Sequence, residues 1–311
     1  MSILVAADFS ADEWAAWWPA LQAALPGEVL LRERGSTAAH EITIALVANP
    51  AVGALQGLPA LQLIQSLWAG VDKLLADPSV PTAVPLARMV DPAMNEAMAQ
   101  TALWAVLGLH RGFFTYAEQQ RAQQWRQLAQ TRADEVTVAV LGLGQMGRSV
   151  AQRLVRNGYS VIGWSTQAKS VEGVVTSAGD AALPQVLAAA GVVINLLPLT
   201  AATHGLFNAQ RLAHMQRGAS LVNLARGAHV VEADLLAALD RGHLHHAVLD
   251  VFATEPLPAE HPFWRHAKVT VLPHVAAQTD PRSAALIAAA NVRAFRAGAA
   301  PANLVDRRRG Y

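Results

Sequence analysis

Three apolar runs in the second half of the chain end in side chains that can do chemistry. Arg226 follows Leu221–Ala225, Glu255 lies in a proline-bounded loop after Leu249, and His274 follows Val271 by three residues. A histidine can pass a proton to a carbonyl oxygen, and a neighbouring carboxylate favours the charged form of its ring. An arginine binds a carboxylate in a bidentate manner. With a hydride donor nearby, these three side chains suit the reduction of a 2-oxo acid.

Each of these residues also has an ordinary explanation when taken alone. A lone histidine is more often structural, Arg226 could be a salt-bridge partner, and Glu255 a loop carboxylate. All three, however, follow strands that we expect to be parallel. Ligands of open α/β sheets bind outside the carboxyl ends of such strands, so we expect the three side chains to act together.

A glycine loop precedes these residues. Gly142, Gly144 and Gly147 have the spacing G-x-G-x-x-G between the apolar run Val138–Leu141 and a helical pattern. In a dinucleotide site the first glycine allows a tight turn, the second lets the pyrophosphate approach, and the third lets helix and strand pack closely. The following helix offers N–H groups to the phosphates. A purely structural turn is the alternative, and we favour a dinucleotide site.

The end of the next strand, Ile162–Ser170, indicates which dinucleotide binds. NAD sites usually carry Asp or Glu there for the ribose 2′-hydroxyl, and no acid is present here. Ser165 and Thr166 can donate hydrogen bonds, and Lys169 can pair with a phosphate, although Lys169 also fits an ordinary surface position. The sequence therefore favours NADP(H) over NAD(H).

Two successive alternations of strands and helices surround these motifs. The first hundred residues predict strands over 3–6, 29–32, 44–47 and 61–67, with a helix over 12–25 capped by Ser10. A helix starting at Asp91 or Pro92 and reaching His110, with helical spacing continued over 114–130, is expected to bridge two domains or pack on a partner. The second alternation predicts strands over 137–141, 160–164, 192–196, 220–223, 246–250 and 269–272, and helices over 147–157, 183–190, 232–241 and 280–297. We expect an α/β protein of two Rossmann-like, doubly wound parallel sheets.

Composition limits the class of protein. The 311 residues are 53% hydrophobic and 15% charged, and 24 basic against 23 acidic residues leave a net charge of +1. This balance argues against a nucleic-acid or membrane-surface binder. The absence of cysteine excludes disulfides and thiolate metal sites, and we expect no metal. We read neither a secretory signal nor a membrane span, and expect a soluble, cytoplasmic protein.

Several strings resemble the D-isomer-specific 2-hydroxyacid dehydrogenase family, most closely its glyoxylate/hydroxypyruvate reductase A group. The matching strings are Asn223–Gly227, His229–Asp240, Glu255–Pro258, Pro273–Ala277, Ile194–Pro198 and the terminal Arg309–Tyr311. The resemblance implies that His274 is the acid/base, that Glu255 is its partner, and that Arg226 binds substrate. It also implies a homodimer.

The resemblance extends to the binding residues. It implies that backbone N–H groups of Ala69, Gly70 and Val71 hold the substrate carboxylate, and that Trp264 lines the pocket, although a tryptophan serves packing as often. Residues 1–99 with 280–311 are expected to form the substrate domain and 100–279 the cofactor domain, with the active site in a cleft between them. The expected cofactor contacts share a position at or near the ends of strands: Gly142, Gly144, Gln145, Met146, Gly147, Ser165, Thr166, Lys169, Leu197, Pro198, Ala225 and Asp250.

Two departures from the group bear on specificity. Ala48-Asn49-Pro50 stands where the group often has Trp-His-Pro, which predicts a wider pocket, and Trp68 stands where the substrate loop usually begins with glycine. The cofactor loop is poorer in arginine than in the group. The favoured function is NADPH-dependent reduction of glyoxylate or hydroxypyruvate. The alternatives are an NAD-linked dehydrogenase for a bulkier 2-hydroxy acid and a non-catalytic dinucleotide-sensing protein.

Overall fold

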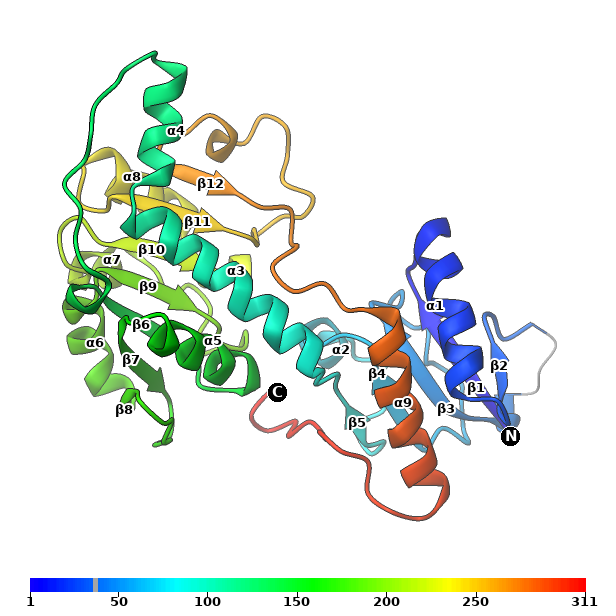
Figure 1. The fold of residues 1–311 in the computed structure, drawn as a ribbon. Helices are drawn as coiled ribbons and strands as arrows, with labels where there is room; N and C mark the ends of the chain where they lie inside the picture. The colour runs from blue at the N-terminus through cyan, green and yellow to red at the C-terminus, as the bar shows by residue number, and fades with distance from the viewer. Residues whose placement is uncertain (36–38) are drawn as a thin grey trace. The chain divides into compact units, whose positions relative to one another are not determined.

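The chain folds into two compact units, which a computed structural model describes for residues 1–35 and 39–311. Residues Met1–Met94 and Thr279–Tyr311 form unit 1, and Asn95–Gln278 form unit 2 (Figure 1). Each unit is built on one parallel sheet, so the predicted α/β class with two doubly wound sheets is confirmed.

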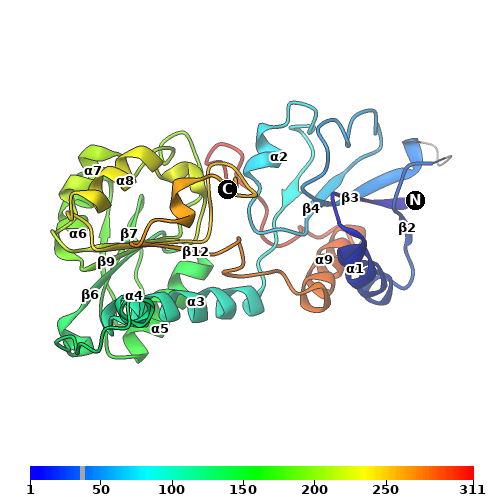
Figure 2. The same cartoon turned by 90° about the horizontal axis from the view of Figure 1, so that it is seen from above.

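Unit 1 contains a five-stranded sheet in the order β2-β1-β3-β4-β5. Helices α1 and α9 lie together on one face of this sheet and α2 lies on the other (Figure 2). Ser10 caps α1 as predicted, since its hydroxyl accepts the Glu13 N–H while the Glu13 carboxylate accepts the Ser10 N–H. The bounds are β1 Ser2–Ala7, α1 Ala11–Ala24, β2 Val29–Leu31, β3 Ile42–Ala48, β4 Leu63–Ser66, α2 Asp72–Ala76, β5 Leu86–Ala87 and α9 Pro281–Arg296.

Unit 2 contains a seven-stranded parallel sheet in the order β12-β11-β10-β9-β6-β7-β8. Its strands are β6 Thr137–Leu141, β7 Ser160–Ser165, β8 Val175–Ala178, β9 Val192–Asn195, β10 Ser220–Asn223, β11 His246–Leu249 and β12 Val269–Val271. Its helices are α3 Pro92–His110, which starts in unit 1, α4 Phe113–Arg121, α5 Gln145–Arg156, α6 Leu183–Ala189, α7 Ala209–His214 and α8 Glu232–Asp240.

Both faces of this sheet are buried, which explains why its strands are almost continuously apolar. Within β6, Ala139 and Leu141 pack in the core on the side of α6, α7 and α8. Val138 and Val140 point the other way, into the core that α3 and α5 share. The two helical layers are visible in Figure 2. This arrangement fixes the carboxyl ends of the strands, where the predicted site residues follow.

The helical pattern over 114–130 is only partly realised, and this prediction is wrong beyond Arg121. Gln123 has a positive φ of 53°, which ends α4, and residues 124–132 form no regular element. Near Leu128 this segment lies beside α4, where the Leu128 N–H donates to the Tyr116 hydroxyl at 3.0 Å. The segment is rich in glutamine and arginine, and Trp125 is 97% exposed, so a helix here would bury little apolar surface.

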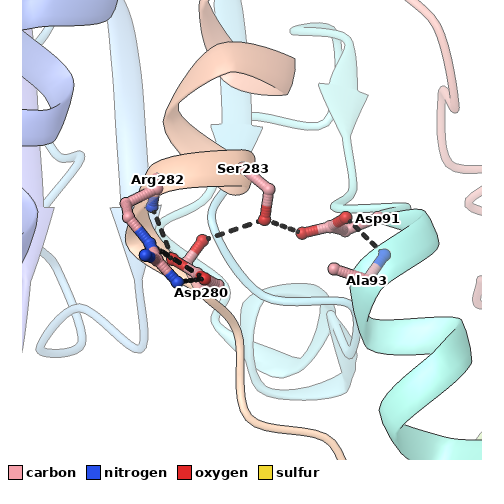
Figure 3. A network of polar contacts seen from close by, with 5 residues as sticks. All are labelled: Asp91, Ala93, Asp280, Arg282 and Ser283. Atoms are coloured by element: carbon pink, nitrogen blue, oxygen red, sulfur yellow. Dashed lines mark hydrogen bonds and ion pairs between the residues drawn. The ribbon is translucent and has the colours of Figure 1, made fainter.

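A hydrogen-bonded network links the two points where the chain passes between the units (Figure 3). The buried Asp91 carboxylate accepts the Ala93 N–H at the start of α3 at 2.8 Å and the Ser283 hydroxyl of α9 at 2.5 Å. Asp280 caps α9 by accepting the Arg282 N–H at 2.9 Å. Next to it, the Thr279 hydroxyl contacts the Met94 sulfur at 3.3 Å. The outgoing and returning segments are therefore tied together within unit 1.

In the described ranges, 1–35 and 39–311, no helix combines the length and the apolar character that crossing a membrane requires.

Candidate active site

The glycine loop joins β6 to α5 and is shaped by close backbone contacts. A Cβ at Gly147 would lie 1.7 Å from the Gly142 carbonyl oxygen, and one at Gly142, whose φ is +100°, would lie 2.7 Å from the Leu196 oxygen. Packing alone therefore requires glycine at these two positions. Gly144 differs, because a Cβ there would meet no atom within 4 Å. Its lack of a side chain leaves the N-terminus of α5 open, which fits a pyrophosphate lying against that helix.

The segment after β7 carries the residues expected to select the cofactor. Trp164 and Ser165 are buried, and the Ser165 hydroxyl donates to the Gln167 carbonyl at 2.7 Å. Thr166 and Lys169 are exposed, and the Lys169 ammonium donates to the Leu143 carbonyl of the glycine loop at 3.1 Å. Burial, and then the nearby charge of Arg148, lower the pKa of Lys169. A cation therefore lies against the loop, and no acid follows β7.

Two buried asparagines, Asn195 and Asn223, shape the loops after β9 and β10. They are partners in the parallel register of these strands, and the Asn195 amide donates to the Asn223 side-chain oxygen at 2.9 Å. The Asn195 oxygen accepts the Leu197 N–H, and the Asn223 oxygen accepts the Ala225 N–H. Sequence reasoning missed this pair, although both residues are amides that end an apolar strand. The pair therefore holds the backbone of Leu197 and Ala225, two of the predicted cofactor contacts.

Gly227 brings the Arg226 segment against the loop that carries Glu255. A Cβ at Gly227 would lie 1.8 Å from the Phe252 carbonyl carbon, so the two backbones touch. The Arg226 guanidinium donates to the carbonyl oxygen of the preceding residue, Ala225, at 2.7 Å. Its positive charge also contributes to the lowered pKa of Glu255, so the two side chains lie near each other.

His274 and Glu255 form a close hydrogen-bonded pair. The His274 Nδ1 lies 2.7 Å from Glu255 Oε2, while Glu255 Oε1 accepts the Phe252 N–H at 2.9 Å. Burial opposes ionisation of Glu255, but the bonds from His274 and Phe252 and the charges of His274 and Arg226 outweigh it, so its pKa lies below the usual value. Glu255 is thus a carboxylate, and the His274 ring presents its other nitrogen, Nε2, away from it.

Asp250 accepts hydrogen bonds from three consecutive backbone N–H groups, those of residues 274–276. Its carboxylate accepts the Val275 and Ala276 N–H groups at 2.7 and 3.0 Å, and its carbonyl accepts the His274 N–H at 2.9 Å. His274 has a positive φ of 55°, an unusual conformation for a residue with a side chain. Burial raises the pKa of Asp250, and the two N–H bonds act against this rise. The structure therefore shows Asp250 supporting His274, and its predicted cofactor contact stays a prediction.

Glu232 and His261, which sequence reasoning missed, brace the loop around Glu255. Glu232 Oε2 lies 3.2 Å from His261 Nε2, and its other oxygen accepts the Ala253 N–H at 3.4 Å. Trp264 follows in this loop, half exposed, with its indole N–H donating to the Pro258 carbonyl at 2.9 Å. No local pattern marks Glu232, because it starts a helix as many acidic residues do.

The predicted substrate loop lies in unit 1, directly after β4. The Ser66 hydroxyl accepts the Trp68 N–H and donates to the Trp68 carbonyl, and the Trp68 ring packs against Phe9 and Trp17. Within the described part of the chain, no hydrogen bond uses the N–H groups of the three residues that follow, Ala69–Val71. Ala48, at the end of β3, is only 1% exposed, so its side chain faces packed neighbours instead of open space.

Comparison with known proteins identifies the family. Residues 103–276 match the family described as "D-isomer specific 2-hydroxyacid dehydrogenase, NAD binding domain". The chain belongs to this family. It is 42% identical to a glyoxylate/hydroxypyruvate reductase A of Serratia proteamaculans over 309 residues, 97% of each chain. The resemblance found in the sequence is therefore confirmed.

Two solved structures of the family are similar over the whole chain. One is a D-isomer specific 2-hydroxyacid dehydrogenase of Xanthobacter autotrophicus in complex with NADPH and MES, with 42% identity, a TM-score of 0.94 and coverage of 100% of this chain and 99% of the other. The second is an NADPH-dependent glyoxylate/hydroxypyruvate reductase of Sinorhizobium meliloti in complex with NADP and sulfate, with 34% identity, a TM-score of 0.93 and full coverage of both chains.

Proposed function

We propose that this 2-hydroxyacid dehydrogenase reduces glyoxylate or hydroxypyruvate, or a 2-oxo acid of similar size, with NADPH. The observation that carries the proposal is the 2.7 Å pair of His274 and Glu255 in the same unit as an open glycine loop. The relatives named as glyoxylate/hydroxypyruvate reductases, and the neighbours solved with NADPH or NADP, support the substrate class and the cofactor.

The roles follow from the chemistry of each side chain. His274 Nε2 donates a proton to the carbonyl oxygen of the substrate, while Glu255 holds the ring through Nδ1 and stabilises its charged form. Arg226 binds the substrate carboxylate and draws electrons from the adjacent carbonyl. The bound NADPH supplies the hydride that adds to the carbonyl carbon. The product is the 2-hydroxy acid, and the histidine regains its proton from water.

We propose Ala69–Val71 as the backbone donors for the substrate carboxylate in unit 1. Three consecutive N–H groups without an acceptor in the described residues suit an anion. The aromatic packing of Trp68 against Phe9 and Trp17 fixes the start of this loop. Trp264 stays a candidate for the pocket wall.

NADP(H) is proposed over NAD(H) because the strand end lacks the acid that would repel a 2′-phosphate. Lys169 lies at the glycine loop instead. Gln145, Met146, Ser165, Thr166, Leu197, Pro198 and Ala225 complete the proposed set of residues around the cofactor.

We also propose a homodimer formed through α3 and α4. Trp104 and Phe113 are 44% and 55% exposed on these helices, and Trp125, in the segment that follows, is 97% exposed. A partner chain would cover such aromatic surface. The cytoplasmic location stays a prediction.

Steady-state kinetics on a panel of 2-oxo acids, each with NADPH and with NADH, test the proposal. We expect the highest kcat/KM for glyoxylate or hydroxypyruvate with NADPH. A preference for NADH with bulky 2-oxo acids would favour the alternative dehydrogenase. Cofactor binding without turnover of any 2-oxo acid would favour a sensing protein.

A further inference from the structure

Two cationic side chains cross between the glycine loop and the segment after β7. Arg148, in the first turn of α5, donates from its guanidinium to the Ser170 carbonyl at 3.2 Å. Lys169 reaches in the opposite direction and donates to the Leu143 carbonyl at 3.1 Å. Both residues are exposed, so their remaining donors are open to a ligand. Sequence reasoning selected Lys169 but not Arg148, which lies 21 positions earlier in the chain.

The two like charges are close enough to act on each other. Burial and the charge of Arg148 together lower the pKa of Lys169. Among the residues that the structure describes, neither cation forms an ion pair with a carboxylate. Holding two such charges together is unfavourable until an anion lies between them. This arrangement is therefore typical of a site for a multiply charged anion.

The position of the pair identifies that anion. Arg148 directly follows Gly147 of the phosphate loop, and Lys169 follows the strand whose end normally contacts the adenosine ribose of the dinucleotide. A 2′-phosphate on that ribose carries up to two negative charges and presents three oxygens as acceptors. An arginine offers a planar fork of donors, and a lysine a compact point charge, so the two complement each other.

We propose that Arg148 binds the 2′-phosphate of NADP(H) together with Lys169, and so selects this cofactor against NAD(H). The proposal rests on the proposed use of NADPH. It also explains how a strand end with no arginine can still accept the phosphate, because the guanidinium comes from α5.

Isothermal titration calorimetry of the full chain with NADPH and with NADH tests this assignment without any substrate. For Arg148→Ala we expect the Kd for NADPH to rise about tenfold, which corresponds to the loss of one charge-assisted interaction. The Kd for NADH should change less than about twofold. Arg148→Lys, which keeps the charge, should recover part of the loss.

Arg156→Ala is the matched control, since Arg156 is an exposed arginine two turns further along the same helix. It should bind both cofactors as the unmodified chain does. Adenosine 2′,5′-bisphosphate and adenosine 5′-monophosphate serve as smaller probes, and Arg148→Ala should weaken only the former. An equal loss for NADPH and NADH, or no loss for either, would overturn the proposal.

The same titrations separate this proposal from the proposed reaction. If the unmodified chain prefers NADPH and loses this preference in Arg148→Ala, the assignment stands even where no 2-oxo acid is reduced. If the chain reduces glyoxylate but Arg148→Ala keeps the full preference for NADPH, the reaction stands and the role of Arg148 is wrong.

Discussion

Replacing Glu255 with glutamine should move the pH dependence of reduction without removing the histidine. Glutamine keeps the size of the side chain and an oxygen that can accept the Phe252 N–H, but it has no charge. In the structure Glu255 has a lowered pKa, so the negative charge is present throughout the neutral range. The substitution thus tests the electrostatic part of the His274–Glu255 pair.

The direction in which the pH profile moves follows from the protonation state of His274 that reacts. In the proposed mechanism reduction needs the protonated ring, so kcat/KM falls as the pH rises. Removing the neighbouring carboxylate makes the protonated ring less stable, and the fall must then occur at lower pH. Well below this fall the variant should approach the activity of the unmodified chain.

The size of the effect on kcat/KM follows from the distance between His274 and Glu255 and from the exposure of the two side chains. At 2.7 Å the pair has the geometry of a charged hydrogen bond, worth about 1.5–3 kcal/mol when shielded from water. The side chains are 52% and 36% exposed, and exposed pairs are worth about 0.2–1 kcal/mol. An intermediate value of about 1.4 kcal/mol corresponds to a loss of about tenfold in kcat/KM on the alkaline side of the profile.

The measurement is kcat/KM for hydroxypyruvate with NADPH between about pH 5 and pH 9. Glu260→Gln, an exposed carboxylate in the same loop, is the control and should leave the profile unchanged. A midpoint that stays in place, with a uniform loss at every pH, would mean that Glu255 only holds the ring. A midpoint that moves to higher pH would refute the reasoning.

Three further outcomes are expected. His274→Ala should lower kcat by about 10²–10⁴-fold, as loss of a general acid does, while the Kd for NADPH measured by calorimetry stays near that of the unmodified chain. Glu232→Ala frees the Ala253 N–H and His261, so kcat should fall several-fold while the KM for NADPH changes little; unchanged kcat would contradict a bracing role. Light scattering at micromolar concentration should show twice 33.0 kDa, and a species of 33.0 kDa alone would exclude the dimer.

The sequence predicted the strands of both sheets best where burial is complete. Strand β10, for example, was predicted with its observed bounds, because Ser220–Asn223 is buried on both faces. Strand β8 was missed, since two of its four residues are exposed at the sheet edge and Val175 is its only large apolar residue. The helix predicted over 114–130 ends at Arg121, because most of the residues that follow are polar and would bury little surface in a helix.

The residues of the candidate site fall into two groups, those marked by a local sequence pattern and those that only the fold brings together. Residues with a local motif, such as the three glycines and the His274 string, could be found from spacing alone. Arg148, Glu232 and the Asn195–Asn223 pair could not, because their partners lie 21 to 29 positions away in the chain and meet them only through the fold. Asp250 was selected from the resemblance as a cofactor contact, whereas the structure shows its carboxylate on the backbone after His274.

The network around Asp91 and Ser283 has a consequence for how the chain can be cut and rejoined. Unit 2 is one continuous stretch, inserted into unit 1 between Met94 and Thr279, whose side chains touch. A short glycine-serine linker from Met94 to Thr279 would make unit 1 one continuous polypeptide. Residues 95–278 would then be encoded separately, as a second polypeptide that contains unit 2 alone. Domain insertions are tolerated at such closely spaced sites. We therefore expect each unit to fold when it is expressed as a separate polypeptide.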